Sequence, residues 1–209
     1  MKKRAYRMTA RADAEERTRL RITESAVALH GSLGPSRTSI SSIAEHAGVR
    51  RSTVYRHFPD EASLFNACTS HWFAMHPLPD LARWAAIHDP DQRLSTALRE
   101  LYLWYRGGER MMLNVLRDEE MPVVREKVEA FGLYLDEARN ILLRGRPRRK
   151  KILQQIIPAL GHALAFSTWR SLAIEQRLND RASAELMARF VRLCSSEKPN
   201  GVRSARRSG

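Results

Sequence analysis

Residues 38–65 read TSISSIAEHAGVRRSTVYRHFPDEASLF, and this stretch decides the fold of the first part of the chain. Two short helices are predicted in it, over residues 40–47 and 51–57, with Gly48 ending the first. The link between them is too short for an antiparallel hairpin of useful length, so the helices must cross steeply, as in a helix-turn-helix. The apolar residues of both are spaced to face one core: Ile43, Ala44, Ala47, Val54 and Phe58.

The second helix of a helix-turn-helix can enter the major groove of DNA, and this one carries side chains suited to that surface. With the apolar face buried, the residues left facing outward are Arg51, Ser52, Thr53, Tyr55 and Arg56. Arginines and hydroxyls can reach base edges and phosphate oxygens. A merely solvated basic helix, the alternative, would explain the arginines but not the tyrosine beside them.

The same stretch closely resembles the DNA-binding signature of the tetracycline-repressor (TetR) family of bacterial transcription regulators. The similarity runs from about residue 22 to residue 65, and its most specific parts are Ile43-Ala44, Ala47-Gly48-Val49, Thr53-Val54-Tyr55 and His57-Phe58. The resemblance implies that Arg51 and Ser52 read bases. The positions it assigns to phosphate contacts are Thr38, Thr53, Tyr55 and His57. The full set of DNA-binding residues expected here is Thr38, Ser39, Arg50, Arg51, Ser52, Thr53, Tyr55, Arg56 and His57.

Two residues depart from the family pattern. Arg50 stands where a serine N-cap is common, so the reading helix is expected to exchange a cap for an additional phosphate contact. Glu61 stands where many members carry a phosphate-binding lysine, so anchoring to DNA must come from the helix N-terminus or from elsewhere.

The charge balance favours a polyanionic partner. The chain has 209 residues and a formal net charge of +13, and residues 1–60 hold twelve basic residues against six acidic ones. No run approaches the roughly 18 apolar residues of a membrane span, and the basic N-terminus lacks the apolar segment of a secretory signal. Two isolated cysteines, Cys68 and Cys194, are typical of reduced thiols. We therefore expect a cytoplasmic protein that binds double-stranded DNA and has no membrane partner.

Helical periodicity dominates the rest of the chain, so the predicted fold class is all-α. Helices are expected over residues 13–33, 111–120 and 123–143, and over 148–176 with a kink or a start at Pro158. A further helical face before residue 111 consists of Leu94, Leu98, Leu101 and Tyr105. The expected organisation is a disordered basic arm (1–12), a helix-turn-helix domain (13–75), a ligand-binding and dimerisation domain (76–196) and a disordered tail (197–209).

The resemblance also implies a ligand pocket and a homodimer interface in the C-terminal helices. The interface is expected from residues 148–176 and 180–195, and a two-fold dimer suits a pseudo-palindromic operator. For the pocket, the candidates are aromatic or soft apolar residues and two polar ones: Tyr102, Trp104, Tyr105, Met111, Met112, Asn114, Phe131, Tyr134, His162, Phe166 and Trp169. Residues of this kind at helical spacing also build an ordinary core, and that alternative stays open for each of them. Since these segments carry few charges, an apolar or aromatic effector is expected.

The predicted function is that of a dimeric repressor released from its operator by such a molecule. The alternative is a nonspecific architectural DNA-binding protein without an effector. An enzyme is not expected, because the sequence has no nucleophile elbow, no glycine-rich phosphate loop and no metal-ligand cluster. No catalytic residue, cofactor or metal site is therefore predicted. The basic run at residues 144–151 is interpreted as a solvated loop, with a nucleic-acid contact as the alternative.

Overall fold

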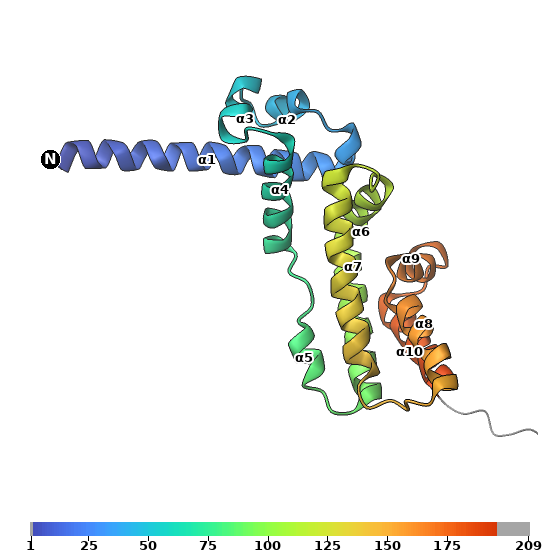
Figure 1. The fold of residues 1–209 in the computed structure, drawn as a ribbon. Coiled ribbons are helices and arrows are strands. Elements are labelled where there is room, and N and C mark those ends of the chain that lie inside the picture. Colours follow the sequence, from blue (N-terminus) through green and yellow to red (C-terminus); the bar gives the residue numbers. More distant parts are fainter. Residues whose placement is uncertain (1, 196–209) are drawn as a thin grey trace, which may run out of the picture. The chain divides into compact units, whose positions relative to one another are not determined.

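The computed structural model describes the backbone of residues 2–195 and the side chains from residue 11 onward. The described part of the chain is helical and contains no strand, which confirms the all-α prediction (Figure 1). In chain order the elements are α1 (Lys2–Ser32), the 3₁₀ turn η1 (Pro35–Arg37), α2 (Ile40–His46), α3 (Arg51–His57), α4 (Glu61–Met75), α5 (Leu81–Ala85), α6 (Pro90–Arg117), α7 (Pro122–Leu143), α8 (Lys150–Leu164), α9 (Phe166–Arg170), the π-helical turn η2 (Ser171–Glu175) and α10 (Asp180–Ser195). The predicted disordered tail, residues 197–209, lies outside the described residues.

The chain forms two compact units that do not follow the sequence linearly. The first unit comprises the chain up to Leu78 together with Gly107–Phe131, so it contains α1 to α4, the end of α6 and the start of α7. The second unit comprises Pro79–Arg106 and the chain from Gly132 onward. A segment from the middle of the chain thus belongs with the N-terminal helices.

Local signals fix the helices around the turn. Ser39 caps α2 by accepting a hydrogen bond from the Ser42 backbone N–H at 3.0 Å, and Asp60 caps α4 in the same way with Ser63 at 2.7 Å. Gly48, with φ of 63°, lies in the left-handed region that glycine occupies without strain and so ends α2. These caps place α3 as a separate short helix between two sharp turns.

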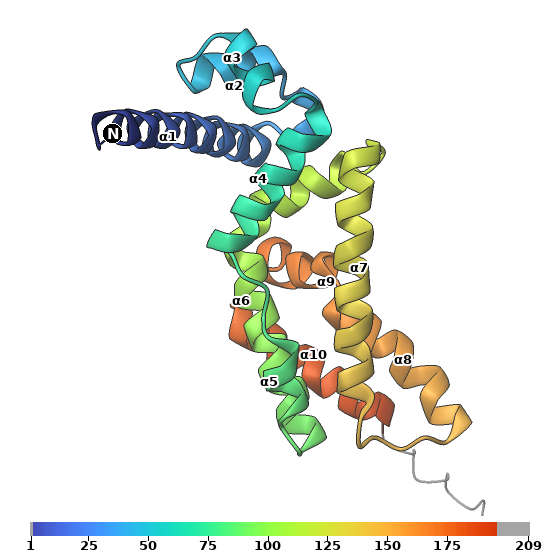
Figure 2. The same ribbon diagram turned by 60° about the vertical axis from the view of Figure 1, so that its left-hand side comes forward.

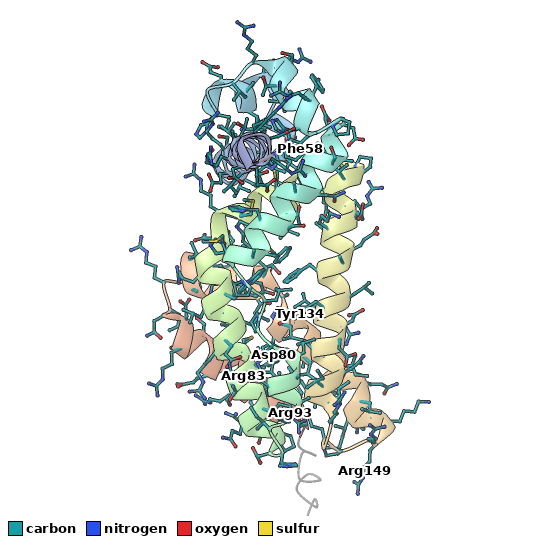
Figure 3. The ribbon with its side chains drawn as sticks, turned by 90° about the vertical axis from the view of Figure 1, so that its left-hand side faces the viewer. Phe58, Asp80, Arg83, Arg93, Tyr134 and Arg149 are labelled. Carbon is teal, nitrogen blue, oxygen red and sulfur yellow. The ribbon has the colours of Figure 1, made fainter. Side chains whose placement is uncertain are left out.

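The core of the first unit is the one that the sequence predicts. Ile43, Ala44, Ala47, Val54 and Phe58 are all at most 4% exposed. They pack with residues from α1 and α4, namely Ile22, Ala26, Leu64 and Cys68. Phe58, at the end of α3, lies next to α1, which Figure 3 shows end-on.

The second unit is built around the N-terminal part of α6. The predicted face of Leu94, Leu98, Leu101 and Tyr105 is fully buried. Two tyrosine hydroxyls of α6 donate hydrogen bonds to the last turn of α8, from Tyr102 to the Ala163 carbonyl at 2.8 Å and from Tyr105 to the Leu164 carbonyl at 2.6 Å. Helix termini leave such carbonyls without intrahelical partners, so these side chains complete the end of α8.

The helix boundaries differ from the predicted ones in three places. α1 begins at Lys2, so it runs through the segment that we predicted as a basic arm. α6 continues through Gly107 and Gly108 without a break (Figure 2), where the sequence predicted a separate helix from residue 111. Gly108 packs against the indole of Trp72, and a Cβ at this position would come within 3.0 Å of that ring, so the glycine serves a close approach.

The third difference concerns the predicted helix over residues 148–176. Pro158 lies inside α8 and neither begins nor ends it. The helix ends at Leu164, since the backbone of the next residue, Ala165, is extended. A single turn of α-helix and a π-helical turn follow before α10. Among the described helices, none combines the length and the apolarity needed to cross a membrane.

Candidate nucleic-acid interface and ligand cavity

Helix α3 presents a polar surface on one side and fills the core with the other. Val54 is fully buried, whereas Arg50, Arg51, Ser52, Tyr55 and Arg56 are exposed and Thr53 is half-buried. Tyr55 is 41% exposed, although the same short helix carries the buried residues Val54 and His57. The outward face thus contains the arginines and hydroxyls that the sequence predicted for it.

Arg51 and Tyr55 form a pair on this surface. One Nη of Arg51 donates a hydrogen bond to the Tyr55 hydroxyl at 3.1 Å, and the guanidinium carbon lies 5.5 Å from the centre of the tyrosine ring. They are one helical turn apart, so the pair restricts the rotamers of both side chains. The sequence predicted the two residues separately and did not predict that they touch.

Arg19 of α1 fixes the C-terminal end of α3. Its guanidinium lies 4.2 Å from the centre of the Phe58 ring and donates a hydrogen bond to the His57 carbonyl at 2.7 Å. Arg19 thus donates to a carbonyl that has no intrahelical partner at the C-terminal end of α3, while its guanidinium stacks on Phe58. This residue was missing from the predicted site, since a sequence pattern cannot distinguish a structural arginine from the others of α1.

The remaining predicted contacts have mixed environments. The hydroxyl of Thr38 donates to the Gly34 carbonyl at 2.7 Å, and that of Ser39 is occupied as the cap of α2. Both residues nevertheless reach the surface, Ser39 more than Thr38. His57 is only 9% exposed, and its Nε2 is buried without a hydrogen-bond partner among the described residues. The structure therefore places His57 in the core side of α3 and not on its outward face.

The two departures from the family pattern can be located. Arg50 is the N-cap residue of α3 and makes no side-chain cap, as expected from the missing serine. Glu61 lies exposed in the first turn of α4, directly after the Asp60 cap. Both acidic residues suit the positive end of the helix dipole, so α4 is stabilised at the position where a phosphate-binding lysine would be expected.

The first unit also contains a small apolar cavity with a volume of about 70 Å³. Its walls come from α1, α4, the last two turns of α6 and the start of α7. The lining residues include three that the sequence predicted for a ligand, Met111, Met112 and Phe131, together with Phe65, Trp72 and Phe73 of α4. The cavity is therefore formed by the same unit that carries α3.

A buried histidine is the main polar group of this cavity. His30, in the last turn of α1, lines the cavity and is 8% exposed. Its ring lies 5.4 Å from the ring of Phe65, centre to centre. Burial lowers the pKa of His30 from 6.5 to about 4, against a smaller opposing effect of Asp118, so the imidazole is neutral at pH 7. His30 is not among the predicted site residues, because a single histidine on an apolar helix face carries no local signal.

Side chains of α6 complete the C-terminal end of α1. Asn114 donates hydrogen bonds from Nδ2 to the His30 carbonyl at 3.0 Å and to the Gly31 carbonyl at 2.9 Å. Arg110 donates to the Ser32 carbonyl. Asn114 was predicted to contact an effector, but its amide faces α1 and it is not among the residues lining the cavity.

Arg117 and Asp118 complete this contact at the turn after α1. Arg117 donates to the Leu33 carbonyl at 2.9 Å and forms a two-bond pair with Asp118. Asp118 accepts a further hydrogen bond from the Ser36 backbone N–H at 3.0 Å. The hydrogen bonds from Arg117 hold the pKa of Asp118 at about 2. Gly34, with φ of 99°, makes room for this pair, because a Cβ there would overlap the Arg117 guanidinium.

The other predicted ligand residues belong to the second unit and take structural positions there. Tyr102, Tyr105, Phe166 and Trp169 are buried at 6% exposure or less. The Tyr134 hydroxyl donates to the Pro79 carbonyl at 2.9 Å, close to the labelled Asp80 in Figure 3. Trp104 packs on Tyr105 and is half-buried, and exposed His162 lies 3.2 Å from the Thr168 hydroxyl. For the four buried residues the structure favours the core alternative.

Two C-terminal helices leave apolar side chains exposed. α8 and α10 pack against each other within the second unit. On their outer surface, 39% to 73% of each of four large side chains is exposed: Ile157, Leu186, Phe190 and Leu193. The last three recur on one face of α10, so the exposed apolar surface is continuous along that helix.

The basic run at residues 144–151 contains one buried arginine. Arg146 is 8% exposed, donates to the Leu142 and Pro90 carbonyls and pairs with Asp91 at 3.1 Å. The other basic side chains of the run are exposed. The solvated-loop interpretation therefore fits only part of the run, because Lys150 and Lys151 lie in the first turn of α8 and Arg146 holds the loop to the start of α6.

Comparison with known proteins identifies the first unit. The family model of bacterial regulatory proteins of the tetR family matches residues 22–68, which cover the turn, α2, α3 and the core around them. Residues 22–68 are therefore similar to the tetR family of bacterial regulatory proteins. A curated relative is the probable acrEF/envCD operon repressor of Escherichia coli, 34% identical over 96 residues. That alignment covers 44% of the chain and only 42% of the relative.

Solved structures of the same fold extend over most of the chain. A TetR-like transcriptional regulator from Rhodococcus sp. RHA1 has a TM-score of 0.61 at 17% identity, covering 83% of this chain and 93% of that one. NalD, the secondary repressor of the MexAB-OprM multidrug efflux pump in Pseudomonas aeruginosa, has a TM-score of 0.57 at 23% identity over 87% and 97%. A complex of SmeT with triclosan has a TM-score of 0.59 at 18% identity over 92% and 98%. At these identities the similarity establishes the fold: an N-terminal helix-turn-helix followed by a helical C-terminal part.

Proposed function

We propose that this protein is a homodimeric repressor of the tetR family that binds a pseudo-palindromic operator and is released from it by a small apolar or aromatic molecule. The observation that carries the proposal is the division of α3 into two faces. Val54 and Phe58 are buried in the core of the first unit, while Arg51 and Tyr55 form a hydrogen-bonded pair on the outside. A surface helix without a partner would not need a restricted arginine beside an exposed tyrosine.

Each outward side chain has a chemical role in this proposal. Arg51 and Ser52, in the first turn of α3, contact base edges, and an arginine can bind guanine through two hydrogen bonds. Thr53, Tyr55 and Arg56 contact phosphates, as do the N-terminal N–H groups of α3, which the uncapped Arg50 leaves accessible. His57 supports α3 from the core side and contributes to DNA binding only through the position of the helix. These roles are assigned by position in the family pattern and by exposure.

The homodimer is proposed through the exposed apolar surface of α8 and α10. Two-fold related copies would bury Ile157, Leu186 and Phe190, which are otherwise exposed to water at 39% to 41%. A two-fold protein would present two copies of α3 to two half-sites one helical turn apart. The second unit would then serve dimerisation and the first unit DNA binding, in a protein of the cytoplasm.

Response to a small molecule is supported by the cavity of the first unit and by the names of the similar proteins. Two of these are repressors by name, and one similar structure holds triclosan. The cavity is small, and its walls are apolar, with aromatic and methionine side chains. An apolar effector is therefore the better proposal than a charged one.

The DNA-binding part is tested by competition on the duplex upstream of the regulated gene. Footprinting of neighbouring genomic DNA should reveal a protected pseudo-palindrome, and random duplex should compete at least a thousandfold more weakly at physiological salt, as is typical of specific DNA binding. Equal competition by random duplex would establish the architectural alternative. The absence of a protected sequence would overturn the repressor proposal.

Substitutions of two arginines of α3 test the proposed base contact and the proposed phosphate contact separately. Arg51→Lys keeps the charge but removes the two-bond contact, so it should lose about 1–3 kcal/mol of discrimination between operator and mutated operator. Arg56→Ala should weaken all duplexes alike and reduce the slope of log K against log salt by about 1. If Arg56→Ala changed discrimination and Arg51→Lys did not, the two roles would be reversed.

A further inference from the structure

We propose that residues 144–151 of the second unit form a second surface for duplex DNA, which contacts the phosphate backbone and does not read its sequence. The inference goes beyond the proposed function, because it requires neither an operator nor an effector and uses no residue of α3. The surface consists of the exposed basic side chains of the loop between α7 and α8 and of the first turn of α8. We call it the basic patch, and Arg149 is labelled in Figure 3: Arg144, Arg148, Arg149, Lys150 and Lys151.

The basic patch carries charges that the protein itself does not neutralise. Residues 144–151 include six basic residues and no acidic one. The buried Arg146 pairs with Asp91 at 3.1 Å, and the exposed Arg144 lies 3.7 Å from the Glu137 carboxylate. Among the side chains that the structure describes, none forms an ion pair with the three other cations that an external polyanion can reach: Arg148, Lys150 and Lys151.

Two buried arginines fix the backbone of the loop that carries the patch. Arg93 of α6 donates to the Ile141 carbonyl at 3.1 Å and to the Arg144 carbonyl at 2.7 Å, and Arg146 binds the loop to the start of α6. Burial lowers the pKa of the Arg93 guanidinium, and the charges of Arg144 and Arg146 lower it further against an opposing effect of Asp89. The electrostatic potential at this loop is therefore positive.

The start of α8 is unfavourable for the helix unless an anion lies beside it. α4 and α10 carry the acidic residues Glu61 and Asp180 in their first turns, whereas the first turn of α8 has Lys150 and Lys151 and no acid. Arg149 is the N-cap residue and makes no side-chain cap. Cations at the positive end of a helix dipole destabilise the helix, and a phosphate group beside them would offset this effect.

The chemistry of the patch favours the phosphates of duplex DNA over a membrane surface or single-stranded bases. An arginine can bind phosphate oxygens through two parallel hydrogen bonds. Gln154 and Gln155, exposed one turn after Lys150 and Lys151, add amide donors of a kind that also contacts phosphates. The exposed residues of the run 144–151 include no aromatic side chain on which a base could stack and no large apolar one that could enter a bilayer.

The test uses the full-length protein and a duplex of random sequence, on a background in which Arg51→Ala and Arg56→Ala remove the arginine contacts of α3. Replacing Arg148, Lys150 and Lys151 by glutamine removes three cations without breaking an ion pair among the described side chains, so the fold should be retained. The affinity for random duplex should fall at least tenfold at 50 mM salt, and the slope of log K against log salt should decrease by about 3. Between 50 and 200 mM salt, three phosphate contacts correspond to a change in affinity of about 40-fold.

The matched control removes three exposed arginines elsewhere in the second unit: Arg83→Gln, Arg99→Gln and Arg181→Gln. It lowers the net charge by the same amount. The affinity should stay within about twofold of the background, because distant charges are screened by salt. An equal loss in both triple variants would reveal a general effect of net charge and would overturn the proposal, as would an unchanged affinity in the variant of the basic patch.

Lysine acetylation followed by mass spectrometry provides a measurement in the wild-type protein, which does not depend on the fold of a variant. Saturating random duplex should slow the acetylation of Lys150 and Lys151. Lys127 of the first unit, whose ammonium group lies 2.7 Å from the Glu126 carboxylate, is the internal reference and should react at an unchanged rate. Equal rates at Lys150 and Lys151 with and without duplex would overturn the proposal.

Vesicles of equal parts phosphatidylserine and phosphatidylcholine test the membrane alternative. If the wild-type protein floats with these vesicles, the variant of the basic patch does not, and duplex leaves Lys150 and Lys151 unprotected, the partner is a membrane surface and the proposal is wrong. Failure of the repressor proposal would be recognised separately. In that case no specific operator is found, while the basic patch still binds random duplex.

Discussion

Replacing Asn114 by alanine should destabilise the first unit, because this side chain completes the C-terminal end of α1. Its Nδ2 group donates to the His30 and Gly31 carbonyls at 3.0 and 2.9 Å, and its Oδ1 accepts from Arg117 at 3.1 Å. Asn114 is 8% exposed, and the bond to the His30 carbonyl is buried. The substitution removes all three hydrogen bonds and leaves no room for bulk water at the inner carbonyl.

The expected loss follows from counting these bonds. Each hydrogen bond contributes about 1 kcal/mol net, and a buried carbonyl left without a partner costs about 1 kcal/mol more. The bond from exposed Arg117 contributes little. The free energy of unfolding should therefore fall by about 3 kcal/mol. With a urea dependence of about 2–3 kcal/mol per molar, the midpoint of unfolding should move by about 1 M.

Urea unfolding followed by circular dichroism, at one fixed protein concentration, measures this shift. Arg110→Ala is the matched control on the same helix, since Arg110 is exposed and makes a single bond of 3.2 Å to the Ser32 carbonyl of the same helix end. It should change the free energy by less than about 0.5 kcal/mol. A stability of Asn114→Ala within 0.5 kcal/mol of wild type, or an equal loss in both variants, would refute the capping role.

Three further predictions concern other parts of the chain. Since burial lowers the pKa of His30 from 6.5 to about 4, only the unfolded chain binds that proton between these pH values, and the free energy of unfolding should fall by about 3 kcal/mol between pH 6.5 and pH 4. Unfolding curves of His30→Leu should lack this part of the pH dependence, and an unchanged slope would contradict it. If the proposed dimer forms through α10, Phe190→Glu should yield a monomer in sedimentation and weaken operator binding at nanomolar concentration, whereas a stable dimer of this variant would exclude α10 from the interface. Tyr105→Phe should lower the melting temperature by a few degrees through the lost bond to the Leu164 carbonyl, and no change in melting would show that this 2.6 Å contact is energetically neutral.

The parts of the fold that were predicted correctly depend on local chemistry. Ser39, Gly48 and Asp60 act within four residues of themselves, and the periodicity of Val54 and Phe58 determines which face of α3 is buried. All of these signals can be read in a window shorter than one helix. The family resemblance covers this same region, so the family pattern and the local physical signals predicted the same helices there.

The parts that were not predicted depend on residues distant in the sequence. α6 continues through Gly107 and Gly108. A glycine is required at position 108 because the Trp72 indole of α4 occupies the space that a side chain would need. In the sequence, Asn114 is a polar residue among apolar ones and was predicted to contact a ligand. In the structure its amide donates to carbonyls of α1, which are distant in the sequence. His57 has the position of a phosphate contact in the family pattern, yet its ring turns toward the core. No propensity or spacing rule contains these contacts.

Gly34 is a position at which two independent requirements coincide. Its φ of 99° excludes most side chains, and the space that a Cβ would need is already taken by the Arg117 guanidinium and the Asp118 carboxylate. Alanine would therefore adopt a strained φ and would also force the Arg117 and Asp118 side chains to move, and asparagine, which tolerates positive φ elsewhere, would still displace this pair. In a saturation screen for operator repression, position 34 should reject nearly every substitution as completely as the base-reading residues do. Such a screen would wrongly assign an operator contact to Gly34. Only a parallel measurement of protein abundance would distinguish the residues that contact DNA from Gly34, which maintains the structure at the end of α1.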